Sequence, residues 1–322
     1  MVGRAVILGV SGQIGAAVAR RLLLDGWDVT GLHRGDTLLA PDLASADGLR
    51  VVLGDRADDA VVAAAVGSVA DALVDVVGYD ETHARQLLRH AADLAALTVI
   101  SSAAVYADAD SLSIGGDAEP RWPVPVTEEQ SLVPADATTY GGGKVLFERT
   151  LLDAVALPVT VLRAGAVYGA GSRHLREWWF VQRVLDGRRR VPLAHGGRSR
   201  FQPVAVANLA AQAVWALDVC ALGQRTSQVL NAGDPDCPTV AEIGALVAAA
   251  TGHEWELVPL TAGEGRVGQT RGRCVTPSCC RWTPRARSGG SPSRRTPGPC
   301  LGSWTPPGRR SASGTGVRST RC

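Results

Sequence analysis

The sequence predicts an α/β fold, a doubly wound parallel sheet that carries a small C-terminal second domain. Short apolar segments rich in β-branched residues alternate with segments of helical periodicity from residue 5 to about residue 250. A glycine-rich turn joins the first strand to the first helix. This alternation is typical of parallel sheets with helices on both faces and ligand sites at the carboxyl ends of the strands. Because the pattern stops near residue 262, we expect the second domain to be incomplete.

The elements follow one another in a regular order. Strands are predicted at residues 5–10, 28–32, 50–55, 72–78, 97–102, 158–167 and 229–231. Helices are predicted at residues 16–24, 58–66, 80–95, from 140 onward, and at 178–185, 205–217 and 239–250. A polar loop with four prolines, residues 107–137, precedes the helix that begins at Tyr140.

The turn after the first strand carries three glycines spaced three apart, Gly9, Gly12 and Gly15. The first allows a tight turn, the second lets the backbone approach a pyrophosphate, and the third lets the helix pack on the strand. Phosphates then lie at a helix N-terminus, where free N–H groups favour anions. The turn therefore predicts a dinucleotide site, with Gln13 and Ile14 among the residues that bind it.

The second strand ends in an arginine, Arg34, where a site for NAD would carry an acid for the ribose hydroxyls. An arginine suits the 2′-phosphate of NADP, although an exposed loop arginine is the alternative interpretation. We expect NADP or NAD as cofactor and favour NADP. Asp55, at the end of the third strand, is a further candidate for binding the cofactor.

A tyrosine and a lysine four residues apart, Tyr140 and Lys144, are candidates for catalysis. On a helix they share one face. Lys144 is the only lysine in the chain, which argues against a chance pair. An ammonium nearby is expected to lower the pKa of the tyrosine, so that it exchanges protons with a substrate oxygen. Ser102, at the end of the fifth strand, is either a third member of this site or a turn cap.

The formal charge of +2 divides unevenly along the chain. All 31 acidic residues lie at or before Glu264, together with 21 basic residues, so this part carries −10. Residues 265–322 hold 12 arginines and no acid. The negative body argues against a broad surface for nucleic acid, so we do not expect residues 1–262 to bind one.

Residues 263–322 are rich in arginine, proline, serine and glycine, and they lack any helical or strand periodicity. This tail is a basic arm for nucleic acid, a zinc module, or the product of a GC-rich gene read in the wrong frame. We favour the last, because the composition changes abruptly at about residue 263. The spacing of Cys274, Cys279, Cys280 and Cys300 matches no paired zinc ligands, and we predict no metal site. We expect the tail to be disordered.

The location of the protein is predicted from what the sequence lacks. No apolar run approaches the ~18 residues of a membrane span, and the N-terminus lacks the charged and apolar regions of a signal peptide. We therefore expect a cytoplasmic protein with no membrane partner.

Four blocks of sequence resemble the extended short-chain dehydrogenase/reductase family, within its NAD-dependent epimerase/dehydratase group. Their order and separations also resemble the family up to about residue 262. The blocks begin at Gly9, Ser102, Tyr140 and Leu162. The resemblance implies a Rossmann fold at residues 1–165, with substrate-domain elements interleaved with late Rossmann elements at residues 166–262.

The resemblance also implies roles for individual residues. Tyr140 would be the acid/base, Ser102 would hydrogen-bond the reacting oxygen, and Lys144 would bind the nicotinamide ribose and lower the pKa of the tyrosine. We add Arg163 and Arg200 as candidates for binding substrate.

The sequence departs from the family at three places. Residues 76–80, Val-Val-Gly-Tyr-Asp, replace a His-Leu-Ala-type stretch and resemble a branch with plant chloroplast RNA-binding relatives and bacterial reductases. Ala166 replaces an asparagine that lies near the substrate diphosphate in nucleotide-sugar epimerases. Asn208 replaces an aspartate. A nucleotide-sugar substrate is thus left open by the sequence.

We predict an NAD(P)-dependent oxidoreductase that acts on a carbinol or carbonyl carbon of a sugar or of a substrate similar to a nucleotide sugar. The partner is a small-molecule substrate, and a homodimer is possible. Two alternatives are a dinucleotide-bound regulator without turnover, including an RNA-binding relative, and an inactive product of the shifted frame.

Overall fold

A computed structural model of the protein describes residues 3–67, 70–114, 120–123, 125–154, 157–200, 202–221 and 226–260. The chain divides into two compact units, Met1–Thr283 and Pro284–Cys322, and all described residues belong to the first. The sequence-based predictions for residues 263–322 therefore lie outside the described residues.

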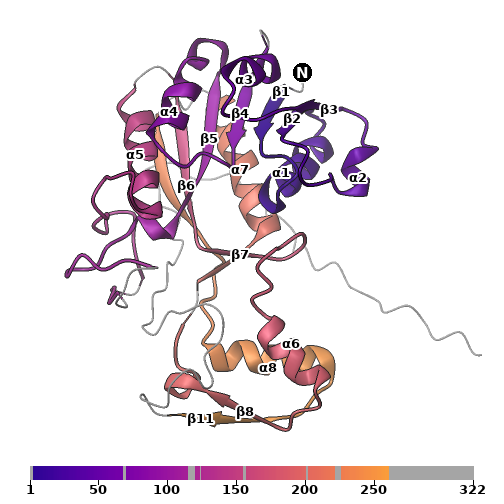
Figure 1. The fold of residues 1–322 in the computed structure, drawn as a ribbon, viewed down its shortest axis with the longest axis vertical. Helices are drawn as coiled ribbons and strands as arrows, with labels where there is room; N and C mark the ends of the chain where they lie inside the picture. Colours follow the sequence, from indigo (N-terminus) through magenta and orange to yellow (C-terminus); the bar gives the residue numbers. More distant parts are fainter. Residues whose placement is uncertain are drawn as a thin grey trace, which may run out of the picture. The chain divides into compact units, whose positions relative to one another are not determined.

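Seven parallel strands form the main sheet, in the order β10-β6-β5-β4-β1-β2-β3 (Figure 1). All seven were predicted from the sequence, and the parallel doubly wound sheet is confirmed. Their bounds are β1 Arg4–Leu8, β2 Asp28–His33, β3 Leu49–Leu53, β4 Ala72–Asp75, β5 Ala96–Ser102, β6 Val159–Ala164 and β10 Gln228–Ala232. The order reverses beside β1, and ligands bind at such a switch point in open α/β sheets.

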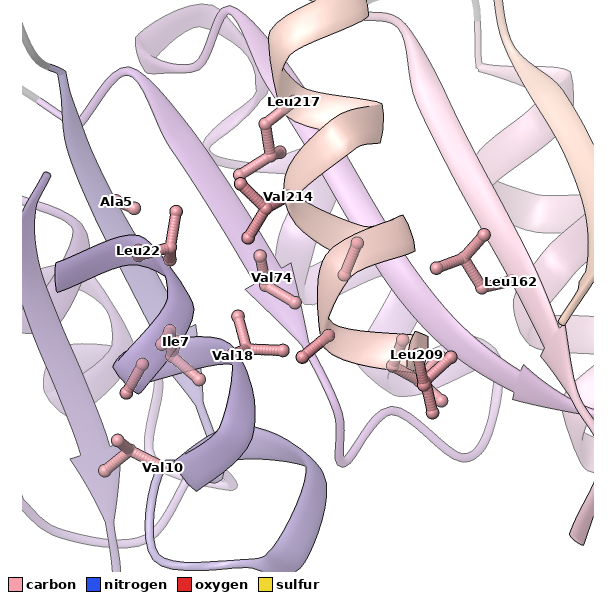
Figure 2. Close-up of a cluster of buried hydrophobic side chains, with 14 of the residues drawn as sticks. Ala5, Ile7, Val10, Val18, Leu22, Val74, Leu162, Leu209, Val214 and Leu217 are labelled. Atoms are coloured by element: carbon pink, nitrogen blue, oxygen red, sulfur yellow. The ribbon is translucent and has the colours of Figure 1, made fainter. Parts of the chain in front are cut away.

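One face of the sheet is covered by α1 (Gln13–Leu24) and α7 (Val206–Ala221). Figure 2 shows Val18 and Leu22 of α1 and Val214 and Leu217 of α7 meeting over this face. The side chain of Ile7 points into the same cluster from β1. Helices far apart in the sequence thus share one core.

The opposite face is covered by α3 (Asp59–Val66), α4 (Glu81–Leu88) and α5 (Tyr140–Asp153). Val6 and Leu8 point into this core, whereas their neighbours in β1 point into the other. Burial on both faces explains why β1 reads as a continuous apolar run and does not alternate with polar residues. Side chains of Asp58, Asp80 and Thr139 cap the starts of the three helices.

A smaller group of elements comes from residues 166–205, between β6 and α7, and from residues 240–259, after β10. Two short parallel pairs join β7 (Ala166–Tyr168) to β9 (Pro203–Ala205) and β8 (Arg190–Leu193) to β11 (Glu256–Pro259). Helices α6 (Trp178–Leu185) and α8 (Val240–Thr251) pack on the second pair around Phe180, which is 2% exposed. Strands β8, β9 and β11 were not predicted from the sequence, whereas β7 begins within the strand predicted at residues 158–167.

The remaining elements are short. They are α2 (Pro41–Ala44) and the 3₁₀ turns η1 (Ala91–Asp93), η2 (Ala103–Val105) and η3 (Ala194–Gly197). The helix predicted at residues 80–95 was wrong in its second half, because the chain leaves α4 after Leu88 and forms η1. The strand predicted at residues 158–167 is divided at Gly165 into β6 and β7.

Candidate active site

The glycine turn begins where β1 ends, at the carboxyl edge of the sheet. Gly9 adopts φ +96°, which favours glycine, and its N–H donates to the carbonyl of Leu32 in β2 at 2.9 Å. A Cβ on Gly15 would lie 2.2 Å from the carbonyl oxygen of Gly9. The turn and the first helix therefore fit together only with glycine at both positions.

The second glycine of the turn, Gly12, is not explained by contacts among the described residues. A Cβ there would meet only the carbonyl oxygen of Gly9, at an ordinary 3.4 Å, among the described residues. Gly12 is also the N-cap of α1 and offers no side chain to the free N–H groups of that helix. A phosphate bound at this N-terminus would use both features. The residues at the turn, with Gln13 and Ile14, therefore fit the pyrophosphate of a dinucleotide.

Two further candidates for binding the cofactor follow the next two strands. Arg34 forms an exposed ion pair with Asp36, with Nη2 and Oδ2 3.2 Å apart. The carboxylate of Asp55 accepts a hydrogen bond from the backbone N–H of Ala57 at 2.9 Å. Both residues lie at the same carboxyl edge as the glycine turn, because β1, β2 and β3 are parallel neighbours. Their roles in binding stay predictions.

Tyr140 and Ser102 come together from the first residue of α5 and the last residue of β5. The hydroxyl of Ser102 hydrogen-bonds Tyr140 and also accepts from the backbone N–H of Ala104 at 3.2 Å. Ser102 thus lies beside Tyr140 and caps the turn that follows β5, while its role in catalysis stays a prediction. Tyr140 is 56% exposed, so its ring is accessible from solvent.

The glycines at the start of α5 explain how the tyrosine reaches this position. A Cβ on Gly141 would lie 2.4 Å from the carbonyl oxygen of Ala104, and one on Gly143 would lie 3.0 Å from that of Tyr79. Three consecutive glycines are poor helix formers, so their presence in a helix indicates that something approaches this backbone closely. In the structure it is the chain's own backbone after β4 and β5, which brings α5 against the ends of both strands.

Lys144 lies beneath Tyr140 and is only 2% exposed. Its Nζ donates to the carbonyl oxygens of Gly78 at 2.5 Å and Ile100 at 2.8 Å. Burial lowers the pKa of Lys144 to about 8, while the carboxylates of Asp75 and Glu148 act in the opposite direction. The single lysine of the chain is therefore held at the edge of the sheet between β4 and β5.

The expected lowering of the pKa of Tyr140 by Lys144 is wrong for this structure. Burial raises the pKa of Tyr140 above its usual value, the hydrogen bond with Ser102 lowers it in part, and Tyr79 adds to the rise. The ammonium of Lys144 is bonded to two carbonyls and lies 5.9 Å from the centroid of the Tyr140 ring. The phenol is therefore protonated at neutral pH.

Arg163, a candidate for binding substrate, is engaged within the protein, and its role in binding stays a prediction. The residue is 5% exposed and forms a buried ion pair with Glu148 of α5, with Nη2 and Oε2 2.7 Å apart. The same guanidinium donates to the hydroxyl of Tyr106 at 3.2 Å and to the carbonyl of Glu128 at 3.3 Å. Glu148 also accepts from Ser101, beside Ser102. Arg163 therefore ties α5 to β5 and β6 from behind the site.

With this geometry established, the sequence can be compared with known proteins. Residues 5–233 match the NAD dependent epimerase/dehydratase family. The chain belongs to this family. The match spans all four blocks of the sequence resemblance, from Gly9 to Leu162 and beyond. No curated protein matches the sequence.

Solved structures of low sequence identity share the fold. UDP-N-acetylglucosamine 4-epimerase from Bacillus cereus is 17% identical with a TM-score of 0.62, over 81% of this chain and 87% of that one. The enzyme WbmH from Bordetella bronchiseptica, in complex with NAD+, is 20% identical with a TM-score of 0.63, over 87% and 89%. The dTDP-glucose 4,6-dehydratase from Bacillus anthracis, in complex with NAD, is 17% identical with a TM-score of 0.61, over 86% and 88%.

One departure from the family has a structural explanation. Asn208, in place of an aspartate, donates to Oδ1 of Asp234 at 2.7 Å. The same carboxylate accepts from the hydroxyl of Tyr168 at 2.9 Å and from the backbone N–H of Ala205, the last residue of β9. A second acid at position 208 would face this buried carboxylate, so an amide is the compatible residue here. Ala166 lies in β7 and offers no polar group.

Arg200, the other candidate for substrate, is partly buried and donates to the carbonyl of Cys237 at 2.6 Å. Its role stays a prediction. Within the part of the chain that the structure describes, no cluster of three or more metal-ligating side chains occurs. Among the same residues, no helix is both long and apolar enough to cross a membrane.

One buried group beside the site was missed in the sequence. Asp75, at the end of β4, is fully buried and forms an ion pair with Arg56, with Oδ2 and Nη1 2.6 Å apart. It also accepts from the backbone N–H of Val77 and so shapes the segment that follows β4. An acid at the end of an apolar strand was the available signal, since buried acids usually have partners.

Proposed function

We propose that the protein is an NAD(P)-dependent oxidoreductase of the epimerase/dehydratase type. The observation that carries this proposal is the convergence of Ser102, Tyr140 and Lys144 at the ends of β4 and β5. In the sheet β4 lies beside β1, whose end carries the glycine turn, and β5 lies on the other side of β4. A dinucleotide whose pyrophosphate lies at α1 would extend along this edge toward Tyr140.

The chain's own residues would handle the proton of the reaction. A bound nicotinamide supplies or accepts a hydride. The protonated Tyr140 gives its phenolic proton to a carbonyl oxygen, and in the opposite direction it takes the proton of a hydroxyl. Ser102, hydrogen-bonded to Tyr140, orients the same oxygen. The hydrogen bond with Ser102, which lowers the pKa of Tyr140 in part, stabilises the phenolate that forms when the tyrosine gives up its proton.

The substrate that we propose has a carbinol or carbonyl carbon in a sugar or a nucleotide sugar. Membership of the family supports this class, and the named relatives of similar fold act on sugar nucleotides. We further propose NADP as the preferred cofactor, because Arg34 follows β2 where an acid would serve NAD. The pairing of Arg34 with Asp36 reduces the positive charge there, so this preference needs a direct measurement.

The first experiment measures binding and turnover separately. Calorimetry with NADH and NADPH reports the affinity, and NMR of a panel of nucleotide sugars with each cofactor reports conversion. Tyr140→Phe should lower kcat by about 10² to 10⁴ and leave the dissociation constant of the cofactor unchanged. Ser102→Ala should be milder, about tenfold, because water can replace one hydrogen bond.

The exposed Ser45→Ala serves as the control for Ser102→Ala, since Ser45 only bonds the carbonyl of Pro41 in α2. A parent protein that binds neither dinucleotide would refute the proposal. A Tyr140→Phe variant that turns over substrate at the parent rate would show that another group transfers the proton.

A further inference from the structure

Tyr79 has no role in the site described so far, yet its backbone is fixed on two sides. It lies in the short segment between β4 and α4. Its N–H donates to Nδ1 of His83 at 3.2 Å, and its carbonyl oxygen lies against Gly143 of α5. The ring makes an edge contact with His83, with centroids 6.0 Å apart, and the residue is 48% exposed. A rigid backbone thus presents a ring whose outer side faces solvent.

The ring of Tyr79 is the aromatic group nearest to the ammonium of Lys144. Nζ lies 5.0 Å from the centroid of Tyr79, 5.7 Å from Phe147 and 5.9 Å from Tyr140. Phe147 is fully buried in the core beneath α5, so it closes the inner side. Tyr79 and Tyr140 are both about half exposed, so each residue lies near the ammonium and also contacts solvent. Lys144 itself is only 2% exposed, so little of it is left for a ligand to contact.

We propose that Tyr79 is a positioning residue that covers Lys144, holding the ammonium on the carbonyls of Gly78 and Ile100 and shielding it from water. The second part of the proposal rests on the proposed function: ribose hydroxyls of a bound dinucleotide reach the ammonium of Lys144 only when the ring of Tyr79 moves aside. Tyr79 covers Lys144 in the cofactor-free protein, so this first part of the proposal is testable without a substrate.

Several charged and titratable groups near Lys144 also influence its pKa. Asp75 and Glu148 raise the pKa of the lysine and Arg56 lowers it, and each acid is bonded to an arginine. His83 on α4 and the phenols of Tyr79 and Tyr140 complete the titratable neighbours.

Burial is the largest cause of the lowered pKa of Lys144. Removing the ring of Tyr79 has two opposite effects on that pKa. Water reaches the ammonium and favours its charged form, whereas the lost attraction between cation and ring disfavours it. Because burial is the dominant cause, the admission of water decides the sign, and the pKa rises.

The experiment exploits the fact that Lys144 is the only lysine of the chain. Protein labelled with [ε-¹³C]lysine gives one lysine resonance, whose chemical shift against pH reports the pKa of Lys144 directly. The cofactor-free parent should titrate at about 8. Tyr79→Ala should raise the pKa by about one unit or more toward its ordinary value. Tyr79→Phe keeps the ring and should titrate within about 0.3 units of the parent.

Trp178→Ala is the matched control, because Trp178 is an aromatic residue of similar exposure (46%) on α6. Its lysine titration should equal that of the parent. If Tyr79→Ala does not fold, Tyr79→Ser replaces it with the same expectation. An unchanged pKa of Lys144 in the folded alanine or serine variant would contradict the proposal that Tyr79 covers Lys144. A rise in the phenylalanine variant as large as that in the alanine variant would contradict it as well.

Addition of NADH to the labelled parent tests the second part. The lysine resonance should shift on binding, and the ring resonances of Tyr79 should shift with it. If the parent binds no dinucleotide, the proposed function is refuted, but the titrations still test whether Tyr79 covers Lys144. If NADH binds and the Tyr79 resonances do not shift, the proposal that the ring moves aside is wrong.

Discussion

At the scale of single residues, Lys144 is the most unusual group of the protein. Its ammonium is buried, and the hydrogen bonds it donates go to neutral carbonyl oxygens. The two acids that face it, Asp75 and Glu148, already pair with arginines. A buried charge without an ion-pair partner of its own lowers the stability of the fold, which proteins accept mainly at functional sites.

This arrangement predicts a pH dependence for the variant Lys144→Met. The folded-state pKa of about 8 is below the unfolded value of 10.5, so between these values the unfolded chain binds more protons. The free energy of unfolding of the parent should therefore rise relative to the variant, by up to about 3 kcal/mol, as pH increases through that window. Below pH 8 the difference should be constant.

Urea unfolding of both proteins between pH 7 and pH 10.5 measures this difference. Tyrosines and arginines titrate equally in the two proteins, so their contributions cancel. Parallel profiles across the window would show that the pKa of Lys144 is not lowered by folding.

At the scale of elements, the segment between β7 and α6 lies over the cofactor turn. The side-chain amide of Gln13 donates to the carbonyl oxygen of Gly169 at 3.3 Å. Further along, Nη2 of Arg173 donates to Oγ1 of Thr37, in the loop that follows β2, at 2.5 Å. The segment thus connects the place expected for the pyrophosphate with the place expected for the adenosine ribose. It brings a second arginine to the region of Arg34.

These contacts predict that Arg173, together with Arg34, reads a 2′-phosphate. Arg173→Ala should weaken the binding of NADPH about tenfold and that of NADH much less, because a charge-assisted contact to the phosphate is lost. Arg34→Asp should reverse or narrow the preference for NADPH over NADH. Calorimetry with both cofactors measures the ratio. Arg85→Ala, an exposed arginine paired with Glu81 on α4, is the control and should change neither affinity. Equal losses for NADPH and NADH would exclude both arginines as readers of the 2′-phosphate.

At the scale of the whole described molecule, late elements complete an early core. Val18 and Leu22 of α1 are fully buried, and they pack with α7, which lies almost two hundred residues further along the chain (Figure 2). β10 then adds the edge strand beside β6. The elements at residues 166–200, between β6 and α7, contribute nothing to the main sheet.

A fragment ending at residue 200 should therefore fail to fold cooperatively, although it contains the glycine turn and Tyr140. Without α7, the apolar face of α1 and of the neighbouring strands faces water, and the lost burial exceeds the few kcal/mol by which domains are stable. The fragment should bind a hydrophobic dye and show a broad thermal transition, whereas the full chain unfolds sharply. A sharp transition in the fragment near that of the full chain would contradict this prediction.

The sequence by itself determined the features that depend on neighbours along the chain. The seven strands of the main sheet, the glycine turn and the helix at Tyr140 follow from local periodicity, turn chemistry and capping, and the family follows from motifs of the same kind. Three poor helix formers in a row, Gly141 to Gly143, also indicate a close approach or a loosely wound first turn, and the structure shows the close approach.

Only the tertiary structure decided where the charges of the site go. Lys144 bonds Gly78, 66 residues earlier, and not the phenol one turn away, and Arg163 is occupied by Glu148 and the hydroxyl of Tyr106. The cover by Tyr79 and the two short parallel pairs also join segments distant in sequence. Burial and ion pairing depend on which strand ends meet, and the pKa of each group follows from those contacts and not from its spacing along a helix.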